Sequence, residues 1–435
     1  MVSLQARSLW RGFLLKGTVI LIPGTTKVEY LEENFAALKM QLSATELQEV
    51  QLVAEKANGP RYPESFLSAL LGDTKELTIL GLECSADDTC AAVVTSNRRI
   101  LSNIVIKQFR EHEVYGGIQA YVAMKAHQRN MPEAIRRALS DANISIEEVD
   151  GIAFTRGPGM GGCLGAGLMA AKGIAAALGK PLVGVHHMQA HALTAFLTTS
   201  VEELPTFPFL TLLISGGHTL LLLATSTTSF QTLATSNDSS IGHAFDRVSR
   251  MLGLEWSDIG PGAALEVFCA TGPDDEELPN DLPQFPLPMP GRLDFSYSGV
   301  LTAVNRYVTD QGGAEKMEPL RKLAVARAFQ RAAAAHLEEK IALALRWCRR
   351  EGFVIHHLVM SGGVASNMYL RSRIRQLLDT SKSRVPIALL LPPPHLCTDN
   401  AVMIAWASME RFRAGDHDDY DVIHMAKWNI EDLAR

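Results

Sequence analysis

Cysteine is scarce in the sequence, and its scarcity excludes a fold built on disulfides. The 435 residues include six cysteines, and no two of them form a CxxC pair. They stand at Cys84, Cys90, Cys163, Cys269, Cys348 and Cys397. A chain of this length buries enough apolar surface to fold without covalent cross-links. We therefore expect reduced thiols in an intracellular compartment.

Long apolar runs and an excess of positive charge are missing as well. No apolar run reaches the roughly 18–20 residues that would span a bilayer, so we expect no membrane domain. The formal net charge of −6 argues against a generally basic surface that coats nucleic acid. Any nucleic acid must then meet a local patch of Lys and Arg, because phosphate contacts need positive charge. The length itself predicts two or three globular domains.

Acidic residues are absent from the first 28 positions, MVSLQARSLWRGFLLKGTVILIPGTTKV. That stretch contains Arg7, Arg11, Lys16 and Lys27 together with serine. An Arg-bearing, acid-free, serine-containing N-terminus is typical of a mitochondrial transit peptide. Short acid-free stretches also arise by chance, so a cytoplasmic location is the alternative.

The segment from about residue 20 to residue 77 differs in pattern from the rest of the chain. In IPGTTKVEYLEENFAALKMQLSATELQEV a turn precedes helical spacing, and Ser43 with Glu46 forms a capping-box pattern. The segment resembles the C-terminal tail of an aldo-keto reductase, where IPGT, YLEEN and GxRYPE recur in that order. The catalytic barrel that precedes such a tail is absent, so we expect no reductase activity. We expect an N-terminal extension with extra helices over residues 1–76.

From Leu77 onward the chain alternates strand and helix patterns, which indicates an α/β fold. Residues 77–101 hold two β-rich apolar runs around a tight acidic turn, as in a hairpin. Residues 149–187, VDGIAFTRGPGMGGCLGAGLMAAKGIAAALGKPLVGVHH, then predict strand, glycine-rich loop, long helix and strand.

Two apolar strands further along, LTLLI and HHLVM, each end in Ser-Gly-Gly, at 215–217 and 361–363. This recurrence predicts a duplicated, two-lobed α/β architecture. We expect lobe I over 77–205, with a C-terminal helix over 400–435 that packs back on it. Lobe II is expected over 206–399.

A surface excursion lies between the two Ser-Gly-Gly segments. PDDEELPNDLPQFPLPMPGR (273–292) is acidic and holds six prolines. Because proline removes a backbone donor and breaks helices, neither a helix nor a central strand is expected there. A helix-rich stretch comes next, at 316–350.

Three histidines lie within six positions of PLVGVHHMQAHALTAF. The composition predicts a buried strand and then a helix, on which His187 and His191 are i and i+4 and share one face. His186 points elsewhere and is expected to be structural. A further ligand is needed, and Asp399 in LLLPPPHLCTDNAVMIAW is the best distant carboxylate. Two His and one carboxylate with open positions suit one divalent ion, iron(II) or zinc.

The same residues allow a simpler interpretation, in which the histidines cap or pack a buried helix. Asp399 alone would be a helix N-cap in most proteins. The i, i+4 spacing also matches the HExxH zinc proteases, but Met188, Gln189 and Ala190 include no acid. Without that general base, metalloprotease chemistry is disfavoured.

The two Ser-Gly-Gly segments are candidates for binding an anion. Glycine lets backbone N–H groups approach closely, and serine adds a hydroxyl donor. Neither segment fits the GxxxxGK[ST] P-loop, and GPGMGGCLGAG fits GxGxxG poorly, so its glycines are expected to permit helix packing. Asp246, in HAFDRVSRMLGL, could accept from a ribose hydroxyl, or it could be a solvated acid on a helix face. Asn367 could serve as an amide donor and acceptor.

Eight motifs of the chain resemble, in their order, those of the universal tRNA N6-adenosine threonylcarbamoyltransferases, formerly described as O-sialoglycoprotein endopeptidases. The motifs are ECSADDT (83–89), YGG (115–117), VHHMQAH (185–191), LISGGH (213–218), AFD (244–246), DFSYSG (294–299), SGGVASN (361–367) and CTDN (397–400). The resemblance covers about Leu77 to Arg435. The acid-free N-terminus and PPPHLCTDNAVMIAW are most similar to the mitochondrial branch.

The resemblance implies an actin-like, sugar-kinase-like fold of two lobes around a nucleotide cleft. It also implies transfer of a threonylcarbamoyl group from threonylcarbamoyl-AMP to N6 of adenosine 37 in tRNAs that read ANN codons. His187, His191 and Asp399 would hold one divalent metal ion. The adenylate substrate would be bound by Leu213, Ile214, Ser215, Gly216, Gly217, Asp246, Gly262 and Asn367. Gly260 competes with Gly262, because WSDIGPGAALE has extra residues relative to the family's PGGP turn.

The attacking amine must lose a proton, and Asp87 and Glu83 are the candidate acceptors. Gln189 replaces an acid that is common within the family's His motif, which leaves the ligands intact but changes their surroundings. The resemblance further implies a homodimer, which needs a separate synthase to supply threonylcarbamoyl-AMP. For tRNA, the candidate contacts are Arg321, Lys322, Arg327, Arg331, Arg371, Arg373 and Arg375, although most would be solvated on a helix face.

Two other classes of function compete with the transferase. A non-catalytic nucleotide- and metal-binding regulator of the actin-like class would keep the Ser-Gly-Gly segments but could lose a metal ligand, and all three candidates are present. A metalloendopeptidase is the other, and it lacks the required base.

Overall fold

Two compact units make up the chain, Met1–Gly72 and Asp73–Arg435. This computed structural model describes residues 75–115, 117–256, 259–279, 281, 284–380 and 385–433, all of them in the second unit. The transit peptide and the helices expected in the N-terminal extension lie outside the described residues.

The first five-stranded sheet has the order β3-β2-β1-β4-β5. Its strands are β1 (Thr78–Glu83), β2 (Thr89–Thr95), β3 (Ile100–Ile106), β4 (Gly151–Gly157) and β5 (Leu182–His186). β1 and β2 pair antiparallel around the acidic turn, so the hairpin expected over 77–101 is confirmed. β4 runs parallel to β1, and β5 runs parallel to β4.

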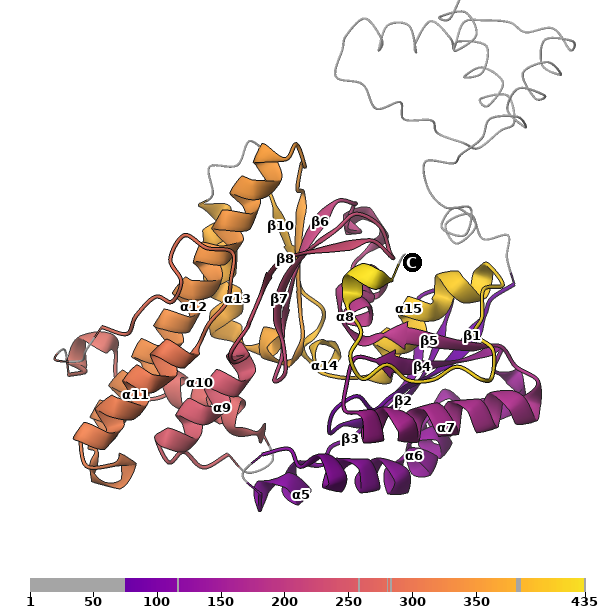
Figure 1. The fold of residues 1–435 in the computed structure, drawn as a ribbon, viewed down its shortest axis with the longest axis horizontal. Coiled ribbons are helices and arrows are strands. Elements are labelled where there is room, and N and C mark those ends of the chain that lie inside the picture. Colours follow the sequence, from indigo (N-terminus) through magenta and orange to yellow (C-terminus); the bar gives the residue numbers. More distant parts are fainter. Residues whose placement is uncertain are drawn as a thin grey trace, which may run out of the picture. The chain divides into compact units, whose positions relative to one another are not determined.

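Helices cover both faces of this sheet (Figure 1). They are α5 (Phe109–Glu113), α6 (Ala120–Ala142), α7 (Gly161–Leu178), α8 (His187–Thr198) and α15 (Ala401–Arg413). Leu80 and Leu82 of β1 pack with side chains of α6 and α7, whereas Ile79 packs on the opposite face with α8 and α15. Gly81 faces α15 so closely that a Cβ there would come within 2.4 Å of the Ala401 carbonyl oxygen, which explains the glycine.

The second five-stranded sheet repeats the topology of the first. Its order is β10-β9-β6-β7-β8. The strands are β6 (Phe209–Ile214), β7 (Thr219–Ala224), β8 (Phe230–Thr235), β9 (His357–Ser361) and β10 (Ala388–Leu390). In both sheets the first three strands form an antiparallel meander, and two later strands add in parallel beside the first. The duplicated, two-lobed α/β fold that the sequence predicts is therefore confirmed.

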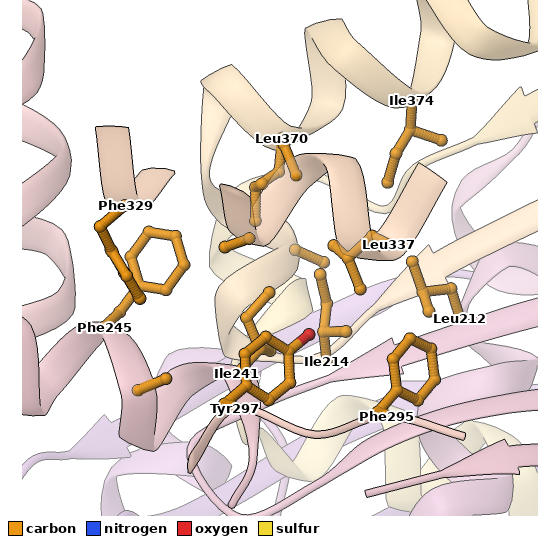
Figure 2. Close-up of a cluster of buried hydrophobic side chains, with 14 of the residues drawn as sticks. Leu212, Ile214, Ile241, Phe245, Phe295, Tyr297, Phe329, Leu337, Leu370 and Ile374 are labelled. Atoms are coloured by element: carbon orange, nitrogen blue, oxygen red, sulfur yellow. The ribbon is translucent and has the colours of Figure 1, made fainter. Parts of the chain in front are cut away.

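The helices of this second half surround one large core. They are α9 (Ile241–Met251), α10 (Pro261–Ala270), α11 (Ser298–Asp310), α12 (Pro319–Arg350), α13 (Met368–Asp379) and α14 (Pro394–Cys397). Figure 2 shows the centre of the core, where Leu212 and Ile214 of β6 meet side chains from α9, α12 and α13. Phe245 and Phe329 contact edge to face there, with ring centroids 5.1 Å apart. This packing fixes the end of β6, where the first Ser-Gly-Gly segment begins.

Helix α8 is the element that both sheets share. Every residue from His187 to Leu197 is buried. Ala190 and Leu197 pack against the first sheet, while Met188 and Phe196 pack with the second. A helix that is apolar on all sides belongs inside a protein, and α8 accordingly lies between the two halves.

The C-terminal helix is shorter than expected. We predicted a helix over 400–435, but α15 ends at Arg413. Gly415 follows the C-cap Ala414 and has a φ of 67°, a left-handed conformation that suits glycine just past a helix end. The described residues after it are irregular, apart from a 3-10 turn at Ile430–Asp432. Other 3-10 turns lie at Ile146–Glu148, Val201–Glu203, Asp275–Glu277, Ala314–Lys316 and Gly363–Ser366.

Among the described helices, α7 is long and apolar enough to cross a membrane. It connects β4 to the parallel strand β5 and packs on α6 and on the sheet, with Leu164 and Leu168 buried. This is the place of a crossover helix in an α/β fold. The strand, glycine-rich loop, helix and strand expected over 149–187 are thus confirmed.

Candidate functional site: a histidine-aspartate cluster between two turns

The two spaced histidines face one point because of how α8 begins. His186 is the N-cap of the helix, and its Nδ1 accepts a hydrogen bond from the Met188 N–H at 3.1 Å. His186 is thus structural, as expected. His187 and His191, one turn apart, place their ring centroids 4.7 Å from each other.

Asp399 reaches the same point from the start of α15. The simpler expectation was that Asp399 caps this helix, but the cap is Asn400, whose Oδ1 accepts from the Met403 N–H at 3.0 Å. The Asp399 carboxylate is therefore available to the histidines. Its Oδ1 lies 3.1 Å from Nε2 of His191 and 3.5 Å from Nε2 of His187.

These three side chains fit a divalent metal ion. Their ligand atoms all lie within 4.8 Å of one another. Ligands at about 2.0–2.2 Å from one ion lie at most about 4.4 Å apart, so small side-chain movements would bring the three groups onto one ion, and two imidazoles with a carboxylate suit zinc or iron(II). The other ring nitrogens face away from this point: Nδ1 of His187 lies 3.0 Å from Glu83 Oε2, and Nδ1 of His191 lies 3.5 Å from Ser361 Oγ.

Glu83 supports His187 from behind. It is fully buried at the end of β1, and its carboxylate also accepts from the Thr155 hydroxyl and from the Ser85 N–H. A carboxylate that holds the second nitrogen of a metal-binding histidine fixes the ring and its tautomer. This contact gives Glu83 an orienting geometry, distinct from that of a group that would face the attacking amine.

The charges of this cluster depend on one another. Burial alone would lower the pKa of His187, but Glu83 and Asp399 on its two sides outweigh burial and raise that pKa to about 10. Burial would raise the pKa of the Asp399 carboxyl, and His187 instead holds it well below its usual range. Without metal, His187 is therefore protonated between the two carboxylates, with Nδ1 toward Glu83 and Nε2 toward Asp399, and an ion bound at Nε2 would take the place of the proton on that nitrogen.

The acidic turn between β1 and β2 brings two more carboxyl groups to the site. Burial, reinforced by the charge of Asp399, raises the pKa of Asp87 to about 6, and the charge of Asp246 adds to this effect. Burial and the charge of Asp87 raise the pKa of Asp88 well above its usual value. Asp88 Oδ1 is buried without a hydrogen-bond partner. Sequence reasoning overlooked Asp88, although it is the adjacent acid of the same ADDT turn.

The glycine turn between β6 and β7 takes the corresponding place in the second sheet. Its Ser215 Oγ accepts from the His218 N–H at 3.1 Å, and Ser215 O accepts from the Gly242 N–H at 3.3 Å. Gly216 and Gly217 are exposed, and a Cβ at either position would meet nothing within 4 Å. The turn is therefore fixed at its base and open at its tip.

Three further candidates lie around this opening. Burial raises the pKa of Asp246, while a hydrogen bond from the Gly262 N–H opposes the increase. This contact favours Gly262 over Gly260, which instead has a φ of 82° as the N-cap of α10. Asn367 is the N-cap of α13, and its Oδ1 accepts from the Leu370 N–H at 2.9 Å. The Asn367 amide N–H groups are left to donate elsewhere.

The two Ser-Gly-Gly segments lie side by side because β6 and β9 are neighbouring parallel strands. Leu213 is paired with Ser361 in this register. Gly362 has a φ of 99°, and a Cβ there would come within 2.3 Å of the Ile214 carbonyl oxygen. Gly362 thus serves the fold, whereas the glycines at 216 and 217 are free to serve a ligand.

His218 is a second group that sequence reasoning missed. Burial lowers its pKa to about 4, and the charges of His187 and His191 contribute while Asp399 opposes them. A neutral imidazole therefore lies near the histidine-aspartate cluster, at the end of the glycine turn. The motif LISGGH contained this signal, but we assigned only its first five residues to the substrate.

The arginines expected to contact tRNA are mostly engaged within the protein. Arg371 is buried and donates to the carbonyl oxygens of Ala365 and Pro392, so the expectation for Arg371 is wrong. Arg327 and Arg331 both pair with Asp275 of the acidic excursion.

Two copies of one sheet topology, an open glycine turn and a histidine-aspartate cluster define the class of protein. It is a two-lobed α/β protein of duplicated topology, with the cluster between its halves. The family model described as TsaD, tRNA N6-adenosine threonylcarbamoyltransferase, matches residues 99–406. The chain belongs to this family, and it is a tRNA-modifying transferase.

Relatives over most of the chain carry the same description. A "tRNA N6-adenosine threonylcarbamoyltransferase" of Rhizobium leguminosarum is 41% identical over 82% of this chain and 95% of its own length. A "Probable tRNA N6-adenosine threonylcarbamoyltransferase, mitochondrial" of Arabidopsis thaliana is 39% identical over 79% of this chain and 70% of its own length.

Similar solved structures are more distant. Component A of (R)-2-hydroxyglutaryl-CoA dehydratase from Acidaminococcus fermentans aligns with a TM-score of 0.46 at 14% identity, over 78% of this chain and 99% of that one. YeaZ from Pseudomonas aeruginosa aligns with a TM-score of 0.27 at 15% identity, over 57% of this chain and 98% of that one.

Proposed function

We propose that this protein transfers the threonylcarbamoyl group of threonylcarbamoyl-AMP to N6 of adenosine 37 in tRNAs that read ANN codons. The observation that carries the proposal is the meeting of His187, His191 and Asp399, from segments 208 residues apart, within a chain of this family. The acidic turn and the glycine turn flank this meeting point from the two sheets.

The glycine turn receives the adenylate end of the donor. Backbone N–H groups at Gly216 and Gly217 suit its phosphate, because a Cβ at either position would meet nothing within 4 Å, whereas the Ser215 N–H already donates to the His218 carbonyl oxygen. Leu213 and Ile214 hold the turn in place from β6. Asp246 and the Asn367 amide offer an acceptor and donors for the nucleoside, and Gly262 lies against Asp246.

His187, His191 and Asp399 hold one divalent ion, iron or zinc, with Glu83 fixing the ring of His187. When bound, the metal supplies Lewis-acid polarisation and a template for the threonylcarbamoyl group. The neutral imidazole of His218, close to this centre, adds a donor or acceptor that carries no competing charge.

Asp87 accepts the proton of the attacking amine. In the transfer step, N6 of adenosine forms a bond to the carbamoyl carbon, the bond from that carbon to the phosphate oxygen breaks, and AMP leaves. One N6 proton goes to the Asp87 carboxylate, whose pKa of about 6 leaves it ionised yet basic at neutral pH. No cysteine is needed as a nucleophile, and burial raises the pKa of Cys84, which lies nearest to the site in sequence.

The two competing functions fit the geometry less well. A regulator would not require three intact ligands with an orienting carboxylate behind them. A peptidase would need a base next to the metal, and the position of the HExxH glutamate is taken here by Met188, which is followed by Gln189. The Gln189 amide donates to the Thr227 carbonyl oxygen at 2.9 Å and so joins α8 to the β7–β8 turn.

The protein works as a homodimer that receives its donor from a separate synthase and acts on tRNA. Helix α7 supports a contact between two copies, because only a third of this apolar helix is buried. Met169 is 68% exposed, and Gly165 and Gly173 present a flat surface with no atom near a Cβ position. A monomer in light scattering at micromolar concentration would contradict the dimer. The mitochondrial relative from Arabidopsis supports a mitochondrial location.

The test is an in vitro transfer assay. Purified protein, an adenylate-forming synthase, threonine, bicarbonate and ATP are incubated with unmodified tRNA, and nucleosides are measured by mass spectrometry. We expect threonylcarbamoyladenosine from the wild type, none from His187→Ala, and a normal yield from Asp310→Asn, a change at an exposed position. Absence of product with metal-loaded wild-type protein would favour the regulator.

A further inference from the structure

One buried histidine, His127, forms hydrogen bonds on both sides of the two aspartates in the acidic turn. Directly before Asp87, the Ala86 carbonyl oxygen lies 2.9 Å from Nε2 of His127 on α6. Directly after Asp88, the Thr89 hydroxyl lies 2.8 Å from Nδ1 of the same imidazole. One buried ring thus bridges the two residues that flank the carboxyl pair.

The bridge continues away from the turn as a chain of hydrogen bonds. Nε2 of Gln108 donates to the Thr89 hydroxyl at 3.3 Å. Oε1 of Gln108 lies 3.2 Å from Nε2 of His112 on α5. Nδ1 of His112 accepts from the backbone N–H of Gln119, the N-cap of α6, at 3.3 Å. The chain therefore connects the start of α6 with the acidic turn.

The two backbone ends of the chain determine the direction of every hydrogen bond in it. The Gln119 N–H can only donate, so Nδ1 of His112 carries no proton and Nε2 does. The Ala86 carbonyl can only accept, so Nε2 of His127 is protonated and Nδ1 accepts from the Thr89 hydroxyl. The Gln108 amide fits between these ends in one orientation, with its oxygen toward His112.

Burial keeps this arrangement in one state. Thr89 and His127 are 0% exposed, and Gln108 and His112 are 1% and 4% exposed, so water offers no substitute partner. Burial lowers the pKa of both imidazoles, so both stay neutral at physiological pH. Loss of any one partner in this series of hydrogen bonds leaves a buried polar group without a hydrogen bond, which lowers the free energy of unfolding.

We propose that His127, Gln108 and His112 are positioning residues, which hold Asp87 and Asp88 at the angle that the transfer reaction needs. This inference rests on the proposed role of Asp87 as proton acceptor. The three residues are not among the proposed substrate-binding or metal-binding groups, and they act through the backbone at Ala86 and the hydroxyl of Thr89. A displacement of about 1 Å at a reacting group lowers rates by about 100-fold.

The test uses two changes at Thr89 and one control on the same strand. Thr89→Val keeps the shape but removes the hydroxyl that joins Gln108 to His127, whereas Thr89→Ser keeps that hydroxyl. Thr95→Val removes another buried hydroxyl of β2, one without a hydrogen-bond partner. We expect Thr89→Val to lower kcat about 10–100-fold with little change in KM for threonylcarbamoyl-AMP. Thr89→Ser and Thr95→Val should stay within about threefold of the wild type.

The variants and the wild type are compared as folded, metal-loaded proteins, and each outcome then distinguishes the positioning role from the role of Asp87. Equal kcat values for Thr89→Val and the wild type, with Asp87→Asn inactive, would overturn the positioning role and leave the proposed function intact. An Asp87→Asn protein as active as the wild type would instead overturn the proposed role of Asp87. Nitrogen chemical shifts from NMR give a second readout: both His112 and His127 should be Nε2–H tautomers, and an Nδ1–H tautomer at either would contradict the chain.

Discussion

The two sheets place different chemistry at one topological position. In the first sheet, the turn between its first two strands carries Asp87 and Asp88, and in the second sheet the equivalent turn carries Gly216 and Gly217. One turn carries two carboxyl groups and is half-buried, while the other is uncharged and open to an anion. The duplicated fold brings the two turns to one site, and the residues of each turn decide its task.

The two turns are also held by different means. Buried side chains fix the acidic turn, among them Glu83, His127 and Thr89. The glycine turn is fixed by its own backbone, by Ser215 and by the Ser240 hydroxyl, which donates to the Gly216 carbonyl oxygen. A reacting carboxylate needs rigid surroundings that fix its orientation, whereas a phosphate-binding turn needs mainly open space and free backbone N–H groups.

Removing the proposed metal centre between the turns should have the largest effect. Asp399→Ala deletes the oxygen shared by both histidines, so we expect metal content below detection and transfer reduced by about 1000-fold or more. Elemental analysis and the transfer assay measure the two quantities. Full activity of metal-free Asp399→Ala would show that the turns work without the centre.

Neutralising the acidic turn should come next. Asp87→Asn keeps the shape of the side chain but removes its proton acceptor, so we expect kcat to fall by about 100–1000-fold. In the wild type, kcat should decline as pH falls through about 6, because protonation of Asp87 has the same consequence. A pH profile of single-turnover transfer checks this, and a profile that is flat from pH 5 to 8 would contradict it.

The acidic turn should also lower the free energy of unfolding at neutral pH, because it holds an ionised carboxylate, whereas the glycine turn has no such group. The folded pKa of Asp87 is raised from 3.8 to about 6, so the folded protein binds this proton more tightly than the unfolded chain. Wild-type stability therefore falls as pH rises from about 4 to about 6. A pKa difference of about 2 between the folded and unfolded states corresponds to about 3 kcal/mol. The free energy of unfolding of Asp87→Asn should therefore exceed that of the metal-free wild type by this amount at pH 7.

Chemical denaturation with a chelator present measures this difference at pH 4 and pH 7. The gain in unfolding free energy should be near zero at pH 4 and complete above pH 6. The same gain at both pH values would assign it to packing and not to titration of the carboxyl group.

Blocking the glycine turn should give the smallest of these effects. A Cβ at Gly217 would meet no atom within 4 Å, so Gly217→Val should leave the melting temperature unchanged, while KM for threonylcarbamoyl-AMP rises about 10–100-fold. Gly362→Ala is the matched control in the second Ser-Gly-Gly segment, where a Cβ meets the Ile214 carbonyl oxygen. It should instead destabilise the fold by about 1–3 kcal/mol. Calorimetry and steady-state kinetics separate the two.

Local patterns predicted much of the fold. The β1–β2 hairpin, the β4–α7–β5 unit and the helix that begins at His187 all follow from periodicity and turn residues over short stretches. The length of α15 was predicted wrongly, although Gly415 in AGDHDDYD marked its end. A helix pattern of 13 residues had been extended through polar residues that carry no apolar stripe.

Long-range pairings could not be predicted from spacing. Nothing in the sequence between His191 and Asp399 shows that their side chains lie 3.1 Å apart, so the residues offered Asp399 only as a candidate ligand and the family resemblance supported that choice. Glu83 was predicted as a proton acceptor because it is an acid near the turn, and its contact with His187 requires knowing that β1 ends beneath α8. His127 and His112 look like isolated histidines on helices until the fold brings them to Thr89.

The most direct measurement is a comparison of Gly217→Val with Asp87→Asn under full steady-state kinetics. The two turns do different work if Gly217→Val raises KM for threonylcarbamoyl-AMP while kcat stays within about twofold, and Asp87→Asn lowers kcat while that KM stays unchanged. We expect this separation. If both variants alter the same parameter, the two turns act as one binding surface, and the division of labour between the sheets is wrong.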